Sequence, residues 1–283
     1  MGGGDGEELE GVVLVFDFDR TIIEECDSDD WVVENLGLSL LFNALLPTMP
    51  YNSLMDRVME ELHLRGTKVQ EIEECLKKIP LSPNTISAIR SAYASGCDLR
   101  IVSDANTFFI ETILKYHGML QCFSEINTNP SFVTEDGSLK ILPYHDFKSS
   151  PHGCNLCPPN LCKGLIIDRI QASSPKKRLI YIGDGKNDFC PSLKLSPRDH
   201  VMPRKNFPLW NTICSNPKHI KAGVHEWING EELEKTLKNL IHSLILGDQN
   251  PNEFLRLGCK SETGSVSASR SIKNTVGVPH LCG

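Results

Sequence analysis

Two aspartates one residue apart, Asp17 and Asp19, follow directly after an apolar run at residues 12–16. The run is typical of a buried strand, in which successive side chains point to opposite faces, so both carboxylates would leave the backbone on the same side. Carboxylates this close repel each other unless a cation or a proton lies between them. Because open α/β sheets bind ligands at the carboxyl ends of their strands, the pair indicates metal-dependent chemistry at that edge.

Polar residues also follow two other apolar runs. Ser103 and Asp104 come after residues 99–102, and a Gly-Asp-Gly motif that begins at Gly183 comes after residues 178–182. In a parallel sheet such loops gather at one edge, next to Asp17. This convergence is stronger evidence than any single motif, because an isolated Asp-x-Asp is common on surfaces, Gly-Asp-Gly is often a turn, and Ser-Asp often caps a helix.

Hydrolysis of a phosphate monoester would use groups from all three loops. Mg²⁺ prefers oxygen ligands, which the side chains of Asp17 and Asp184 and the main-chain carbonyl of Asp19 would supply. The Ser103 hydroxyl and the Lys163 ammonium would bind the phosphoryl oxygens. Asp17 would be the nucleophile, and Asp19 would act first as general acid and then as general base.

Four further loop residues are expected to support this chemistry. Asp188 would orient Lys163 or a metal-bound water, with Asn187 beside it in the same outer shell. Thr21 and Gly185 are expected to contact the substrate.

The alternation of strand-like and helical segments predicts an α/β fold, with a Rossmann-like parallel sheet and helices on both faces. Helical spacing between the first two strands predicts a small α-helical cap inserted after the first strand, and Asp136-Gly137 predicts a hairpin turn. The expected division is a flexible leader at 1–10, a core at 11–28 and 80–246, the cap at 29–79, and a disordered tail at 247–283.

Composition narrows the possible partners. The 283-residue chain has a formal net charge of −7 and no long apolar run. Nucleic-acid binding usually requires clustered positive charge, and a membrane span requires about 20 apolar residues, so we expect neither partner. The 11 cysteines are an odd number with no visible export signal, which favours reduced thiols and a cytoplasmic location.

A compact group of metal-ligating residue types precedes Lys163. His152, Cys154, Cys157 and Cys162 have a spacing that could bind Zn²⁺ tetrahedrally and so order the loop that leads to the lysine. The alternative is a set of reduced thiols in a loop stiffened by proline.

The chain resembles the haloacid dehalogenase-type phosphatases, whose four motifs are matched in order by Asp17-Phe18-Asp19-Arg20-Thr21, Ser103, Lys163 and Gly183-Asp184-Gly185-Lys186-Asn187-Asp188. Within them it is similar to the branch that contains phosphoethanolamine/phosphocholine phosphatases, and most of all to plant members, some of them named inorganic pyrophosphatases. Residues 28–30, 46–50, 103–106, 152–164 and 201–204 carry this closer match. The resemblance covers roughly residues 11–245 and implies a Rossmann-like core, a helical cap and Mg²⁺-dependent phosphate release.

The resemblance further implies that Asp29 and Asp104 hold a cationic head group. The alternative is that Asp29 caps a helix beginning near Trp31. Two carboxylates attract an ammonium but repel bare pyrophosphate unless a metal bridges them, so a small phosphorylated substrate of the phosphoethanolamine or phosphocholine type is expected. Inorganic pyrophosphate, thiamine monophosphate and pyridoxal phosphate hydrolysis stay open, as does a catalytically silent regulator that binds a phosphometabolite.

Overall fold

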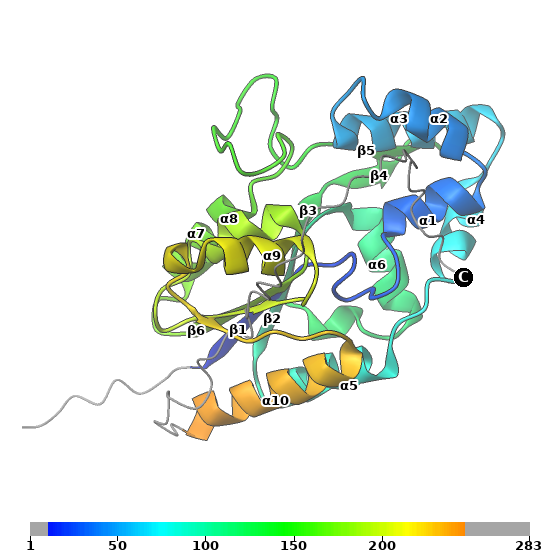
Figure 1. The fold of residues 1–283 in the computed structure, drawn as a ribbon. Coiled ribbons are helices and arrows are strands. Elements are labelled where there is room, and N and C mark those ends of the chain that lie inside the picture. The colour runs from blue at the N-terminus through cyan, green and yellow to red at the C-terminus, as the bar shows by residue number, and fades with distance from the viewer. Residues whose placement is uncertain (1–10, 247–283) are drawn as a thin grey trace, which may run out of the picture.

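The computed structural model of the protein describes residues 11–246 (Figure 1), so the expected leader at 1–10 and tail at 247–283 lie outside the described residues. A six-stranded parallel sheet forms the centre of this part, in the order β3-β2-β1-β6-β7-β8, which confirms the predicted fold class. Its strands are β1 (Val12–Phe16), β2 (Asp98–Asn106), β3 (Glu125–Asn129), β6 (Arg178–Gly183), β7 (His200–Pro203) and β8 (Gly223–Val224).

The central strand β1 is buried on both faces because its alternating side chains enter two different apolar cores. Val12, Leu14 and Phe16 belong to one core, and Val13 and Val15 belong to the other. The first core is closed by α5 (Pro83–Ala94), α6 (Thr107–Tyr116) and α10 (Gly230–Leu246), and the second by α7 (Lys163–Ser173) and α9 (Pro208–Ser215) (Figure 1).

Five helices lie between β1 and β2. The last of them, α5, packs on the first core, and the four before it form the insertion: α1 (Ser28–Asn35), α2 (Ser39–Leu45), α3 (Tyr51–Leu64) and α4 (Val69–Leu76). A hairpin of β4 (Ser131–Val133) and β5 (Leu139–Ile141) lies against them, with Gly137 in its turn at φ 86° (Figure 1). Asp56 of α3 joins the two parts, since its carboxylate accepts the Ile141 N–H at 3.0 Å and pairs with Lys140 at 2.8 Å. The hairpin was predicted from Asp136-Gly137, but its packing against the inserted helices was not.

The chain turns directly after the first strand. This strand ends at Phe16, and the Phe18 carbonyl then accepts N–H groups from residues 21 to 23. Strand β8, which has two residues, and helix α9, which has eight, were not predicted, since short segments give little local signal. Among residues 11–246, no helix combines the length and apolarity that crossing a membrane requires.

Candidate active site

The loop after β1 holds Asp17 in a fixed orientation. Its Oδ1 accepts the Phe18 N–H at 2.7 Å and lies 2.9 Å from Lys163 Nζ. The backbone N–H of Asp17 donates to the Ile182 carbonyl of β6, so the loop leaves the sheet at a defined point. The carboxylate is almost fully buried and still lines a cavity, which suits a nucleophile that must be both rigid and reachable.

Lys163 is the first residue of α7 and is fully buried. Burial alone would lower its pKa, but the carboxylates of Asp17 at 2.9 Å and Asp188 at 2.7 Å raise it above the ordinary value. A cation at a helix N-terminus is unfavourable for the helix dipole, and the two carboxylates offset that cost. The lysine therefore stays charged beside the candidate nucleophile.

Asp188 binds four partners and so acts as the organising carboxylate of the site. Its Oδ1 also accepts the Tyr181 hydroxyl at 2.5 Å, and its Oδ2 accepts the N–H groups of Asp184 at 3.0 Å and Gly185 at 2.8 Å. A Cβ at Gly183 would lie 2.6 Å from Asp188 Oδ2, so the first glycine of the motif makes room for this carboxylate. Tyr181 was not predicted as a site residue. It lies within an apolar strand, and no local pattern indicates that its hydroxyl contacts Asp188 in the following loop.

Asp184 completes a group of three buried carboxylates. Its Oδ1 accepts the Thr21 hydroxyl at 3.1 Å, so Thr21 contacts Asp184. Burial and the Asp188 carboxylate raise the pKa of Asp184 to about 7. Asp17, Asp184 and Asp188 each place a carboxylate oxygen within 4.8 Å of those of the other two. Three carboxylates that repel one another, with oxygen as the only donor atom, are suited to a hard divalent cation such as Mg²⁺. Asp188 already accepts hydrogen bonds on both of its oxygens, so Asp17 and Asp184 are the available ligands.

Asp19 faces the same cavity from the other side of the β1 loop. Its Oδ1 accepts the Ser28 N–H at 2.7 Å, which ties the loop to the start of α1. Burial and the nearby Asp27 carboxylate raise the pKa of Asp19 to about 8. A carboxyl group with a raised pKa can donate a proton near neutral pH, which is the property that a general acid needs.

The last residues of β2, where its pairing with β3 becomes irregular after Val102, meet the Gly-Asp-Gly loop directly. Asp104 Oδ2 accepts the Asn187 amide at 3.0 Å, and a Cβ at Gly185 would lie 2.5 Å from Asn187 Oδ1. Ser103 is fully buried, its Oγ accepts the Ala105 N–H at 3.2 Å, and it does not line the cavity. Asp104, Gly185 and Asn187 therefore face the cavity, while Ser103 lies behind them.

The cavity between these loops and the inserted helices has a volume of about 970 Å³. Its lining is strongly acidic, with eight carboxylates and one guanidinium, that of Arg20, which pairs with Asp27 at 2.9 Å. The acidic residues are Asp17, Asp19, Asp27, Asp29, Asp30, Glu34, Asp104 and Asp184.

Asp29 enters this cavity from the first turn of α1 and is 5% exposed. The helix begins at Ser28 with Asp27 in the N-cap position, so the alternative that Asp29 caps the helix is wrong. Its Oδ1 has no hydrogen-bond partner among the described residues. Burial, followed by the carboxylates of Asp19 and Asp104, raises its pKa well above the usual range.

Comparison with known proteins identifies the family to which these loops belong. Residues 12–241 match the family model described as "Putative Phosphatase". The sequence is 54% identical to Inorganic pyrophosphatase 2 of Arabidopsis thaliana over 262 residues, which cover 90% of this chain and 94% of that protein. The chain belongs to the haloacid dehalogenase-type phosphatases.

Two other curated relatives of this phosphatase have different names. The Thiamine phosphate phosphatase-like protein of Arabidopsis thaliana is 53% identical and covers 82% of this chain and 96% of its own. The human Phosphoethanolamine/phosphocholine phosphatase is 31% identical, and the match covers 82% of this chain and 90% of the human protein. A substrate-bound phosphoserine phosphatase shares the fold, with a TM-score of 0.55 at 16% identity, covering 82% of this chain and 99% of that one.

The cysteine-rich loop of the phosphatase has a different set of neighbours from the predicted one. Cys154, Cys157 and Cys162 lie together with Cys190 of α8 (Phe189–Ser192), and His152 is not part of the group. Both ring nitrogens of His152 contact the loop backbone instead, Nε2 at the Pro158 carbonyl and Nδ1 accepting the Cys154 N–H. Cys190 was missed because 27 residues separate it from Cys162.

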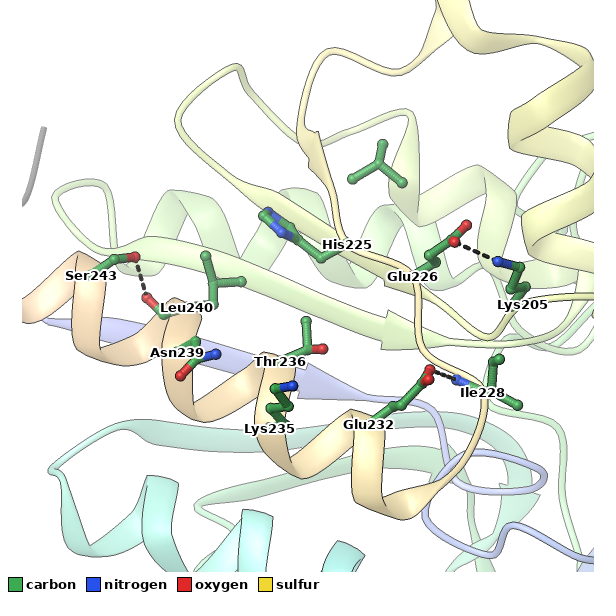
Figure 2. Close-up of a pocket in the computed structure, with 11 residues that line it drawn as sticks. Lys205, His225, Glu226, Ile228, Glu232, Lys235, Thr236, Asn239, Leu240 and Ser243 are labelled. Atoms are coloured by element: carbon green, nitrogen blue, oxygen red, sulfur yellow. Dashed lines mark hydrogen bonds and ion pairs between the residues drawn. The ribbon is translucent and has the colours of Figure 1, made fainter. Parts of the chain in front are cut away.

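A second cavity, of about 390 Å³, lies between β8 and α10 and is lined by no residue of the catalytic loops (Figure 2). Three of its charged groups, Lys205, Glu226 and Glu232, already have partners. Glu226 pairs with Lys205 at 2.7 Å, and Glu232 accepts the Ile228 N–H at 3.1 Å. The acidic cavity is therefore the candidate active site of the phosphatase.

Proposed function

We propose that this phosphatase hydrolyses a small organic phosphate monoester that carries a positive charge near the phosphate, such as phosphoethanolamine, phosphocholine or thiamine phosphate. The observation that carries the proposal is the buried Asp29 carboxylate, which lines the acidic cavity with an oxygen, Oδ1, that has no hydrogen-bond partner within residues 11–246. Ionisation of a carboxyl group at such a depth is costly, which raises its pKa, and a substrate cation would stabilise the ionised form.

The rest of the cavity supports a cationic substrate. Asp104 of β2 and Asp29 of α1 both line the cavity, so a head group there would be near carboxylates from the core and from the inserted helices. The rings of Trp31, Phe42 and Tyr51 also line the cavity. Aromatic rings beside carboxylates are the surroundings in which proteins bind quaternary ammonium groups.

Inorganic pyrophosphate is the second candidate, and the name of the 54% identical relative, Inorganic pyrophosphatase 2, favours it. The acidic lining argues against it, because a second phosphate in the position of the head group would face Asp29, Asp30 and Asp104 with only Arg20 of opposite charge. Hydrolysis of pyrophosphate would require additional metal ions to bridge these carboxylates to the leaving phosphate.

Enzymes of this family generally use Mg²⁺, and the residues here fit that ion. We propose that Asp17, Asp184 and the main-chain carbonyl of Asp19 hold it, because these are hard oxygen donors on converging loops. The ion would supply charge neutralisation between the nucleophile and the phosphoryl oxygens. Lys163, fixed by Asp188, would neutralise charge from the opposite side.

In the proposed reaction, a carboxylate oxygen of Asp17 attacks phosphorus and the bond to the leaving oxygen breaks, while Asp19 donates a proton to that oxygen. A water molecule then gives a proton to Asp19 and attacks the aspartyl-phosphate. The bond between phosphorus and Asp17 breaks, inorganic phosphate leaves, and Asp19 is again protonated. The 2.7 Å bond from Ser28 N–H to Asp19 keeps the acid in place through both steps.

The head-group assignment is tested by Asp29→Asn. We expect kcat/KM for phosphocholine, phosphoethanolamine or thiamine phosphate to fall about 10- to 100-fold, the scale of a lost charged contact, and that for p-nitrophenyl phosphate to change less than about twofold. The variant should be at least as stable to heat as the wild type, since the neutral amide has nearly the same size and cannot ionise in this buried, acidic position. Equal losses on all substrates, or a wild-type preference for pyrophosphate that survives the substitution, would remove the cationic-substrate proposal.

Removal of divalent cations is expected to stop turnover. Phosphate release should fall to background in EDTA and return with excess Mg²⁺, and Ca²⁺ should restore it poorly because it prefers more ligands at longer distances. Full activity in EDTA after dialysis would contradict the metal assignment.

A further inference from the structure

Four cysteine side chains from two separate segments meet at one point beside the active site. Cys154, Cys157 and Cys162 come from the loop before α7, and Cys190 comes from α8. Their sulfur atoms all lie within 4.8 Å of one another, and those of Cys154 and Cys190 are 3.6 Å apart. All four are free thiols, two of them buried and two half-buried.

These distances match a metal site better than a disulfide. Four sulfurs placed about 2.3 Å from a tetrahedral Zn²⁺ are about 3.8 Å from one another. A disulfide needs sulfurs about 2.05 Å apart and joins only two residues. The spacing of two residues between Cys154 and Cys157 is also typical of zinc-binding segments.

We propose that Cys154, Cys157, Cys162 and Cys190 bind one structural Zn²⁺. The four thiols would lose their protons to solvent as the ion binds. With four protein ligands the site has no open position, so the ion would hold structure rather than take part in phosphate transfer. The soft thiolates select zinc, whereas the carboxylates of the active site select Mg²⁺.

The surroundings of the sulfurs suit this site. The Leu156 N–H donates to Cys154 Sγ at 3.4 Å, and such donors stabilise metal-bound thiolates. A Cβ at Gly164 would lie 2.6 Å from Cys190 Sγ, so glycine at this position lets α8 approach the start of α7. His152 contributes by shaping the loop through its contacts with the Pro158 carbonyl and the Cys154 N–H.

The position of the cluster indicates what the ion would do. Cys162 directly precedes Lys163, and Cys190 lies two residues after Asp188. One ion would therefore link the two segments that carry the buried Lys163–Asp188 ion pair, which has a length of 2.7 Å. Without the ion, the irregular loop at 143–162 would lack metal–sulfur bonds to α8, and the cysteines would be joined only by thiol contacts such as that of Cys154 with Cys190.

The test is the metal content of the full-length protein, purified without chelator. We expect about one zinc per chain by mass spectrometry, and thiolate-to-cobalt charge-transfer absorption after replacement by Co²⁺. Cys190→Ser should lose most of the zinc. Cys97→Ser, a buried free thiol elsewhere in the core, and His152→Ala should keep it.

Wild-type protein with less than about one zinc in ten chains, or with a disulfide among the four cysteines, would overturn the proposal. Loss of zinc in His152→Ala with retention in Cys190→Ser would overturn the ligand set. Because metal content is measured without substrate, a negative result leaves the phosphatase proposal standing, and an inactive protein that holds zinc leaves the zinc site standing.

Discussion

Replacement of Asp17 by asparagine is expected to lower kcat by about 10⁴-fold or more, the scale seen when a covalent nucleophile is removed. The amide oxygen can still accept the Phe18 N–H, but it cannot attack phosphorus. Lys163 keeps its 2.7 Å pair with Asp188, so the fold should survive.

Rapid-quench experiments with labelled substrate measure this directly. Wild-type enzyme should transiently carry protein-bound phosphate that hydroxylamine releases, as expected of an acyl phosphate, and Asp17→Asn should carry none. Asp136→Asn is a matched control, because it makes the same change in an exposed hairpin turn where Asn-Gly is equally suitable. Turnover of Asp17→Asn within tenfold of the wild-type rate would refute the nucleophile assignment.

Asp19→Asn is expected to produce a loss that depends on the leaving group. With phosphoethanolamine, whose alkoxide needs a proton, formation of the aspartyl-phosphate should slow by about 10²- to 10⁴-fold. With p-nitrophenyl phosphate, whose phenolate leaves unaided, the first step should be nearly unchanged, and hydrolysis of the intermediate should become limiting because the general base is absent.

Single-turnover kinetics with both substrates separate the two steps. Accumulation of protein-bound phosphate in Asp19→Asn with the aryl substrate is the diagnostic result, and Asp136→Asn again serves as the control. An equal slowing of the first step with both substrates would show that Asp19 positions the loop, through its bond to the Ser28 N–H, rather than transferring a proton.

Much of the candidate site at the carboxyl ends of the strands was predictable, because it depends on patterns among residues that are neighbours in the sequence. The run before Asp17 has the composition of a strand buried on both faces, and residues 178–182 repeat that pattern before Asp184. Parallel strands with intervening helices must end at the same edge, so a carboxylate contact across 167 residues could be inferred without coordinates. The inserted helices and the hairpin turn were likewise marked by local spacing and by Asp136-Gly137.

The remaining features depend on contacts that no local pattern records. Tyr181 and Cys190 look like ordinary residues of a strand and a short helix, and only the packing of β6 and α8 places them at Asp188 and at the cysteine cluster. By itself the sequence determined the fold class, the order of the loops and the residue types available for chemistry, because strand and helix periodicity are properties of neighbouring residues. The tertiary structure alone decided that Asp29 Oδ1 is buried beside the cavity with no hydrogen-bond partner in the described part of the chain, and that Cys190 rather than His152 joins the thiols, because burial and pairing depend on segments distant in the chain.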